Sequence, residues 1–225
     1  SSAASDVYKR QLKYILLGLI KKLLIANQIS PQTDVMFHSI HDLSGVQLLM
    51  TCLLYPIELY ADFSGYTDIA IGGAYMFGIK LSPNFNRWHM SLSFWVRDYL
   101  YVPLTAGTRN WGQWGIYFSL LITFLALGLW HGAGLTFAIY GLIQGVLICW
   151  EMKTAAFRNN LPQYIGKYAA DSLLIVRTYL LFALSLIFFR VQSLSDAWYF
   201  LRNISFEVHS SWKEMNIGTV SYTHL

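Results

Sequence analysis

The sequence predicts an all-α, polytopic membrane protein, a helical bundle with re-entrant or interfacial helices, represented here by a fragment. Of its 225 residues, 55% are hydrophobic and only 12% are charged, about half the charged share of a typical soluble domain. So few charges could not cover a soluble surface of this size. Residues 110–150 also contain no Asp, Glu, Lys or Arg, which is long enough for two membrane-spanning helices.

Composition also limits the domain organisation and the function classes. Residues 1–11 and 220–225 differ from the chain between them, and we expect them to be non-native tails of a transmembrane core over 12–219. The net charge is +4, but the basic residues interrupt apolar runs instead of forming a stripe, so we expect no nucleic acid partner. Cys52 and Cys149 lie inside apolar runs, which predicts neither a disulfide framework nor a metal site.

Five apolar runs are the candidates for membrane helices. They cover residues 12–29, 43–61, 69–79, 110–150 and 173–189. The run 69–79 is too short to span a bilayer, and we predict that it is re-entrant or interfacial. We expect Pro56 to kink the second run, and Arg177 to extend toward the cytoplasmic interface from near one end of the last.

The charges between these runs predict an orientation. The segments 80–109 and 151–171 are rich in Lys and Arg, whereas 30–42 carries two Asp residues and no Lys or Arg. Because basic loops stay in the cytoplasm, we expect the first two segments inside and a loop at 30–42 outside. Residues 110–150 then form a helical hairpin that enters and leaves from the cytosol.

The middle of this hairpin contains an ionisable side chain. The string LGLWHGAG at residues 127–134 places His131 among three glycines, where helices can break or pack closely. An ionisable group at membrane depth is a functional hypothesis by default. A neutral, desolvated imidazole could act as a general base. A packed histidine that donates to a backbone carbonyl, or one at the far interface, is the alternative.

Residues 84–103 predict an amphipathic helix that ends at Pro103. His89, Ser93 and Arg97 recur at four-residue intervals on one face, and could bind an anionic or polar ligand. The aromatic face carries Trp88, Leu92, Trp95, Tyr99 and Val102. The simpler interpretation is a helix that lies in the headgroup layer.

A pair of acids ends the run 43–61. Glu58 and Asp62 are four residues apart, and acids at that depth are costly unless they are paired. Lys21 and Lys22 are the candidate partners.

Several ordered strings resemble the membrane-bound O-acyltransferase superfamily, and within it the bacterial alginate O-acetyltransferase branch. They are YADFSGYTDIA at 60–70, RWHMSLS at 87–93, RDYLYVP at 97–103, GLWHGA at 128–133, FFRV at 188–191 and SDAW at 195–198. The pattern departs from the family where Asn86 directly precedes Arg87, which predicts a deletion there, and at Thr105–Gly107, where members tend to have a glycine pair.

The resemblance implies roles for individual residues. It places the essential catalytic histidine of the family on His131 and a second catalytic histidine on His89. Candidate substrate-binding residues within the motifs are Asp62, Trp88, Ser93, Arg97, Asp98 and Trp130. No bound cofactor and no metal are implied.

The resemblance also implies an activity: acyl transfer, such as acetyl transfer, from a cytosolic thioester donor to a hydroxyl of an extracytoplasmic polysaccharide such as alginate. The donor would be acetyl-CoA or an acyl carrier. The partners would be membrane lipid, the polysaccharide acceptor or a periplasmic acetyltransferase, at the bacterial cytoplasmic (inner) membrane. The alternatives are D-alanyl transfer in teichoic acid modification, a transporter, and a non-catalytic scaffold.

Overall fold

The computed structural model describes residues 2–79 and 90–206, and every regular element in these ranges is helical. This confirms the predicted all-α class. In chain order the α-helices and the π-helical or 3-10 segments (η) are α1 (Ser2–Leu19), η1 (Ile20–Ala26), α2 (Asn27–His38), η2 (Ile40–Asp42), α3 (Gly45–Met76), α4 (Met90–Val96), η4 (Arg97–Tyr101), α5 (Val102–Gly107), η5 (Arg109–Trp111), α6 (Gln113–His131), α7 (Leu135–Lys153), α8 (Ala155–Ile165), α9 (Lys167–Arg190) and α10 (Leu194–Asn203).

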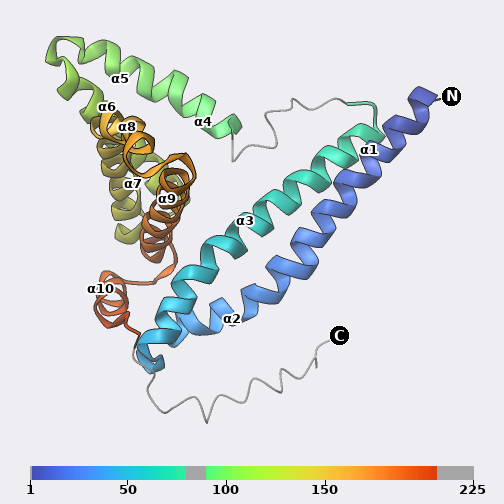
Figure 1. Cartoon of the computed structure of the whole chain (residues 1–225), viewed down its shortest axis with the longest axis horizontal. Helices are drawn as coiled ribbons and strands as arrows, with labels where there is room; N and C mark the ends of the chain where they lie inside the picture. Colours follow the sequence, from blue (N-terminus) through green and yellow to red (C-terminus); the bar gives the residue numbers. More distant parts are fainter. Residues whose placement is uncertain (1, 80–89, 207–225) are drawn as a thin grey trace.

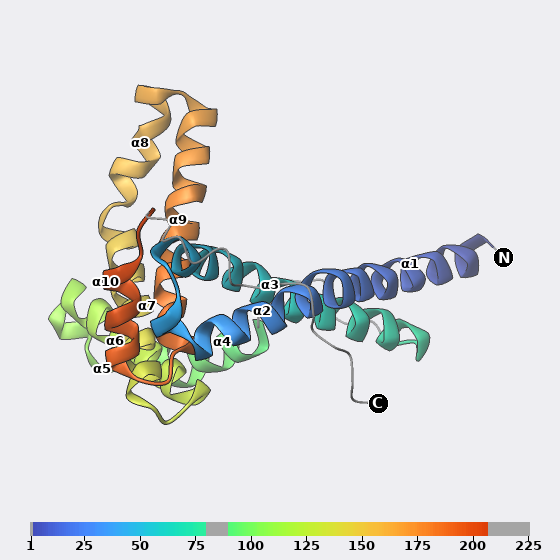
Figure 2. The same ribbon diagram turned by 90° about the horizontal axis from the view of Figure 1, so that it is seen from below.

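The elements form two groups. The continuous helical stretch α1–η1–α2 lies alongside α3, and helices α6–α9 stand as a bundle beside the first half of α3 (Figure 1). The α8–α9 hairpin extends away from the rest of the bundle (Figure 2). The predicted loop at 30–42 is therefore wrong for residues 30–38, which belong to α2 and include Pro31 within the helix.

Glycines allow α1 and α3 to approach closely. A Cβ atom added at Gly18 would lie 2.6 Å from the Gly65 carbonyl oxygen, and one at Gly72 would lie 2.6 Å from the Ile15 side chain. The run 69–79 is not a separate element, because α3 runs without interruption to Met76. Gly72 is a packing position within this long helix, and the re-entrant or interfacial placement of the run stays a prediction.

The same interface contains two ion pairs. Lys21 Nζ lies 2.7 Å from Asp68 Oδ2, and Lys22 pairs with Asp62. Both lysines lie in the π-helical segment η1, where the helix is wider than an α-helix. The prediction that Lys21 or Lys22 pairs with Glu58 and Asp62 is confirmed for Asp62. Glu58 instead accepts a hydrogen bond from the Thr33 hydroxyl.

Residues 90–107 form one helical run made of α4, η4 and α5, so the prediction that Pro103 ends this helix is wrong. Pro103 lies in the first turn of α5, directly after the π-helical segment η4. Trp95 and Tyr99 are exposed, with ring centroids 5.4 Å apart. Residues 84–89 of the predicted amphipathic helix lie outside the described residues.

The predicted hairpin over 110–150 is confirmed. Helices α6 and α7 are antiparallel neighbours joined by the short connection 132–134. At the other end of α7, Glu151 forms ion pairs with Arg158 of α8 and Arg177 of α9. Arg177 thus lies level with the end of α7 and is paired with a carboxylate, and its extension toward the cytoplasmic interface stays a prediction. The predicted loop 151–171 also contains a helix, α8.

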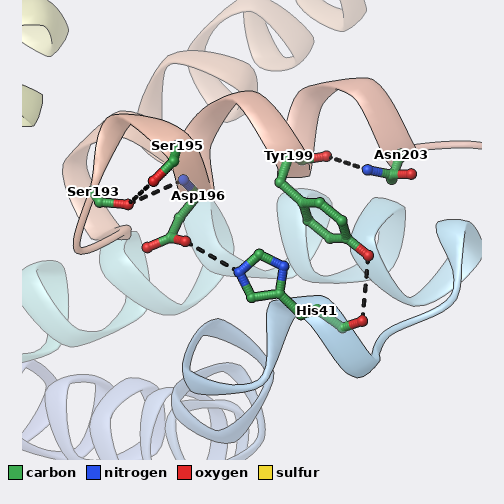
Figure 3. Close-up of polar contacts among 6 residues, drawn as sticks. All are labelled: His41, Ser193, Ser195, Asp196, Tyr199 and Asn203. Atoms are coloured by element: carbon green, nitrogen blue, oxygen red, sulfur yellow. Dashed lines mark hydrogen bonds and ion pairs between the residues drawn. The ribbon is translucent and has the colours of Figure 1, made fainter.

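A core cluster joins α2, α3, α9 and α10. Its buried members include Phe37, Leu48, Leu186 and Phe200, which are at most 6% exposed. Polar contacts complete the docking of α10: His41 Nε2 lies 3.2 Å from Asp196 Oδ1, and the Tyr199 hydroxyl donates to the His41 carbonyl at 3.3 Å, while Ser193 caps the helix (Figure 3).

Three of the described helices, α6, α7 and α9, are long and apolar enough to cross a membrane. The helices that contain the predicted spans 12–29 and 43–61 are not among them. Ionisable residues interrupt both: Lys21 and Lys22 in the first, Glu58, Asp62 and Asp68 in α3.

Candidate functional site

His131 is the last residue of α6, and the chain after it turns sharply into α7. The turn depends on Gly132, because a Cβ there would lie 2.4 Å from the Phe137 ring. The glycine therefore lets Phe137 fold back over the connection. This local sequence places the imidazole at the tip of the hairpin.

The two helices of the hairpin touch backbone to backbone. A Cβ on Gly128 would lie 2.3 Å from the Phe137 carbonyl oxygen, and a Cβ on Gly141 would lie 2.3 Å from the Phe124 carbonyl oxygen. Small residues at helix contacts are typical of membrane proteins. The close approach fixes the height of His131 relative to the side chains of α7.

Phe189, near the end of α9, brings the hairpin tip into contact with the rest of the bundle. Its ring packs edge-to-face against His131, Phe137 and Tyr140, with centroid separations of 5.3, 5.3 and 5.2 Å. Edge-to-face packing is a favoured arrangement of aromatic rings. The orientation of the imidazole is therefore linked to the position of α9.

A cavity of about 510 Å³ adjoins these rings where α3, α4, α6, α7 and α9 meet. This volume is within the range of small-molecule sites. Most of its wall is apolar. The lining residues are Leu59, Phe63, Leu92, Ser93, Phe124, Leu127, Gly128, His131, Tyr140, Gly141, Gln144, Phe182, Leu186 and Phe189.

Two of the predicted site residues meet in this cavity. Ser93 of α4 and His131 of α6 both line it, although they are far apart in the sequence. The His131 side chain is exposed at the protein surface, at the end of a helix long and apolar enough to cross a membrane. The cavity can hold a small polar group against the imidazole within largely apolar walls.

The other predicted residues lie elsewhere. Arg97 and Asp98 are exposed and pair with each other at 2.7 Å, and the hydrogen bond from Arg97 lowers the pKa of Asp98. Asp62 pairs with Lys22 at the α3 interface, and Trp130 is 71% exposed. None of the four lines the cavity.

Trp88 and His89 lie outside the described residues, so their predicted roles stay predictions. The junction of Asn86 and Arg87 lies there too.

The sequence argument missed a polar strip on α7. Tyr140 and Gln144 line the cavity one helical turn apart, and Gln144 Nε2 donates to Ser185 Oγ of α9 at 2.7 Å. A signal was present, because Thr136, Tyr140 and Gln144 recur every four residues along an otherwise apolar helix.

The sequence is similar to that of known membrane enzymes. The model of the membrane-bound O-acyltransferase family matches residues 7–189. A peptidoglycan O-acetyltransferase of Helicobacter pylori is 36% identical over 198 residues, which are 80% of this chain and 36% of that protein. The probable alginate O-acetylase AlgI of Pseudomonas aeruginosa is 34% identical over 194 residues, 80% of this chain and 35% of that protein.

A teichoic acid D-alanyltransferase of Bacillus subtilis is 30% identical over 162 residues, 64% of this chain and 41% of that protein. The chain thus spans little more than a third of the first two relatives. The family match covers most of the chain, including the hairpin, His131 and Phe189. The chain belongs to the membrane-bound O-acyltransferase family.

Proposed function

We propose that this protein is an O-acyltransferase that moves an acyl group, such as acetyl, from a cytosolic thioester donor toward a hydroxyl of an extracytoplasmic polysaccharide such as alginate. The observation that supports it is His131, which shares a cavity with Ser93 at the tip of the membrane hairpin. A multi-pass protein in the bacterial cytoplasmic membrane would have access to both substrates. Acetyl-CoA or an acyl carrier is the donor we propose, with no bound cofactor.

The proposed chemistry uses His131 as a general base. Its neutral imidazole accepts the proton of the acceptor hydroxyl as the oxygen attacks the thioester carbonyl carbon. The C–O bond forms, the C–S bond breaks, and the leaving thiolate takes the proton from the imidazolium. The acceptor is the polysaccharide itself or a hydroxyl of a periplasmic acetyltransferase that completes the transfer. His89 is the second catalytic histidine of this proposal.

A test compares His131→Ala with His38→Ala in vesicles given a donor with a labelled acetyl group. His38 is an exposed histidine on α2 and does not line the cavity, so its loss should leave transfer unchanged. Removal of a general base costs about 10²- to 10⁴-fold, and His131→Ala should lose that much while still inserting into the membrane. Normal labelling of the acceptor by His131→Ala would refute the mechanism.

D-alanyl transfer in teichoic acid modification is the second candidate, supported by the similarity to the Bacillus subtilis protein. The two candidates differ in the acyl group. Vesicles supplied in parallel with labelled acetyl and D-alanyl thioesters separate them, because transfer of only one label identifies the donor class.

A further inference from the structure

The cavity has one wall whose chemistry the proposed acyl transfer does not use. Gln144 and Tyr140 contribute amide and phenol groups to an otherwise apolar section of α7. Both groups already have partners in the protein, but a carboxamide has more donors and acceptors than these contacts use, and a polar feature of a ligand could bind the remaining ones.

The amide of Gln144 is held in one orientation. The Ser185 hydroxyl donates to the Phe182 carbonyl at 2.7 Å, so its oxygen is left to accept the N–H of Gln144, also at 2.7 Å. Ser185 is 2% exposed. A carboxamide has two N–H donors and two acceptor lone pairs. The bond to Ser185 occupies one of these four hydrogen-bonding positions, and a hydrogen bond with Tyr140 occupies another. The amide can therefore still accept or donate a hydrogen bond within the cavity.

The position of Gln144 along the hairpin indicates which part of a ligand it meets. Leu135 starts α7 beside the His131 turn, and Gln144 comes nine residues later, about 13 Å along the axis at 1.5 Å per residue. Gln144 therefore lies between the tip and the end of α7 that carries Glu151, at the part of the cavity away from the tip.

We propose that Gln144 is a specificity-determining residue that binds a secondary amide in the arm of the acyl donor, behind the thioester. This inference rests on the proposed function. In a cysteamine arm extended by β-alanine, the outer amide lies about 7–10 Å behind the sulfur when fully extended, which suits a thioester near His131 and an amide near Gln144. The side-chain amide would pair with the amide of the arm, and the aromatic walls would enclose its methylene groups.

The test uses two synthetic donors of equal length. One is S-acetyl-N-(N-acetyl-β-alanyl)cysteamine, and the other has its outer amide replaced by a chain of carbon atoms. A hydrogen bond is worth about 0.5–1.5 kcal/mol, so the wild-type chain should prefer the amide donor by up to about tenfold in kcat/KM. In Gln144→Leu the preference should fall to about one, while both donors still react.

Binding of the matching thioethers, which cannot transfer the acetyl group, separates this inference from the proposed function. Dissociation constants measured by calorimetry should show the same preference in the wild type and its loss in Gln144→Leu, whether or not transfer occurs. The double variant Gln144→Leu/Ser185→Ala removes the anchoring hydroxyl as well and should behave like the single variant. An unchanged preference for the amide compound in both variants would overturn the inference. Absence of transfer with intact, Gln144-dependent binding would count against the proposed function alone.

Discussion

Lys21 of η1 and Asp68 of α3 form an ion pair at 2.7 Å, with side chains 30% and 12% exposed. The pair joins the first helical stretch to α3 beside the close contact of Gly18 and Gly65. A partly buried pair is poor evidence of net stability, but removing one member leaves an uncompensated charge.

We expect Asp68→Asn to lower the free energy of unfolding in detergent by about 1–3 kcal/mol, a value reduced from the fully buried case because Lys21 is partly exposed. The double variant Lys21→Met/Asp68→Asn should recover part of this loss, because no single charge remains. A double-mutant cycle measured by denaturant unfolding gives the coupling energy. Strictly additive losses would contradict the pairing.

The glycine contact of the hairpin predicts a strong response to a single methyl group. In Gly128→Ala the added Cβ meets the Phe137 carbonyl oxygen at 2.3 Å, so α6 and α7 must separate. We expect the free energy of unfolding to fall by about 1–3 kcal/mol, and thermal unfolding in detergent measures this change.

Gly73→Ala is the matched control, since a Cβ at Gly73 has nothing within 4 Å. Alanine is the better helix former, so this change should be neutral or stabilising. Equal effects of the two substitutions would show that the close approach of α6 and α7 does not limit stability.

Phe189 should act as a positioning residue for His131. Phe189→Leu removes the three edge-to-face contacts, so we expect a drop in kcat of about tenfold with little change in KM for the donor, because the imidazole loses its orientation. The pH dependence of kcat should also change, since the ring packed against the imidazole is part of its environment. Phe157→Leu, at a residue that is 66% exposed on α8, is the control. A Phe189→Leu enzyme with a wild-type kcat and pH profile would exclude this role.

The Arg97–Asp98 pair predicts a local titration. Its hydrogen bond lowers the pKa of Asp98, so the pair stabilises the fold above the ordinary Asp pKa of about 3.9 and loses this effect as the pH falls through the lowered value. Carboxyl NMR should give an Asp98 midpoint below about 3.9, returning toward 3.9 in Arg97→Gln. The same midpoint in both proteins would mean that the pair does not form in solution.

Some features that the sequence predicted correctly depend on where charged residues are present or absent. The charge-free stretch 110–150 forms the α6–α7 hairpin, and Lys22 of the first apolar run pairs with Asp62 as expected. Both follow because an unpaired charge is costly in apolar surroundings. This cost is the same whichever tertiary fold the chain adopts.

The errors arose where a single residue was interpreted without its neighbours. The run 69–79 was taken as a segment of its own, but its Gly72 packs against Ile15 inside the continuous helix α3. Pro31 and Pro103 lie within helical stretches that sequence rules would end. Gln144 was overlooked because its significance depends on Ser185, 41 positions away in the sequence, and one sequence without its fold cannot show that contact.

The last turn of α9 joins two parts of the molecule through adjacent residues. Phe189 contacts the hairpin tip, and the next residue, Arg190, pairs with Asp34 of α2. Neighbouring residues in a helix point about 100° apart, so one rigid turn serves both contacts. A shift of α2 relative to the bundle would therefore rotate the ring that supports His131. The last turn of α9 is thus a mechanical link between α2 and the cavity, and a displacement of α2 would reach the imidazole through it.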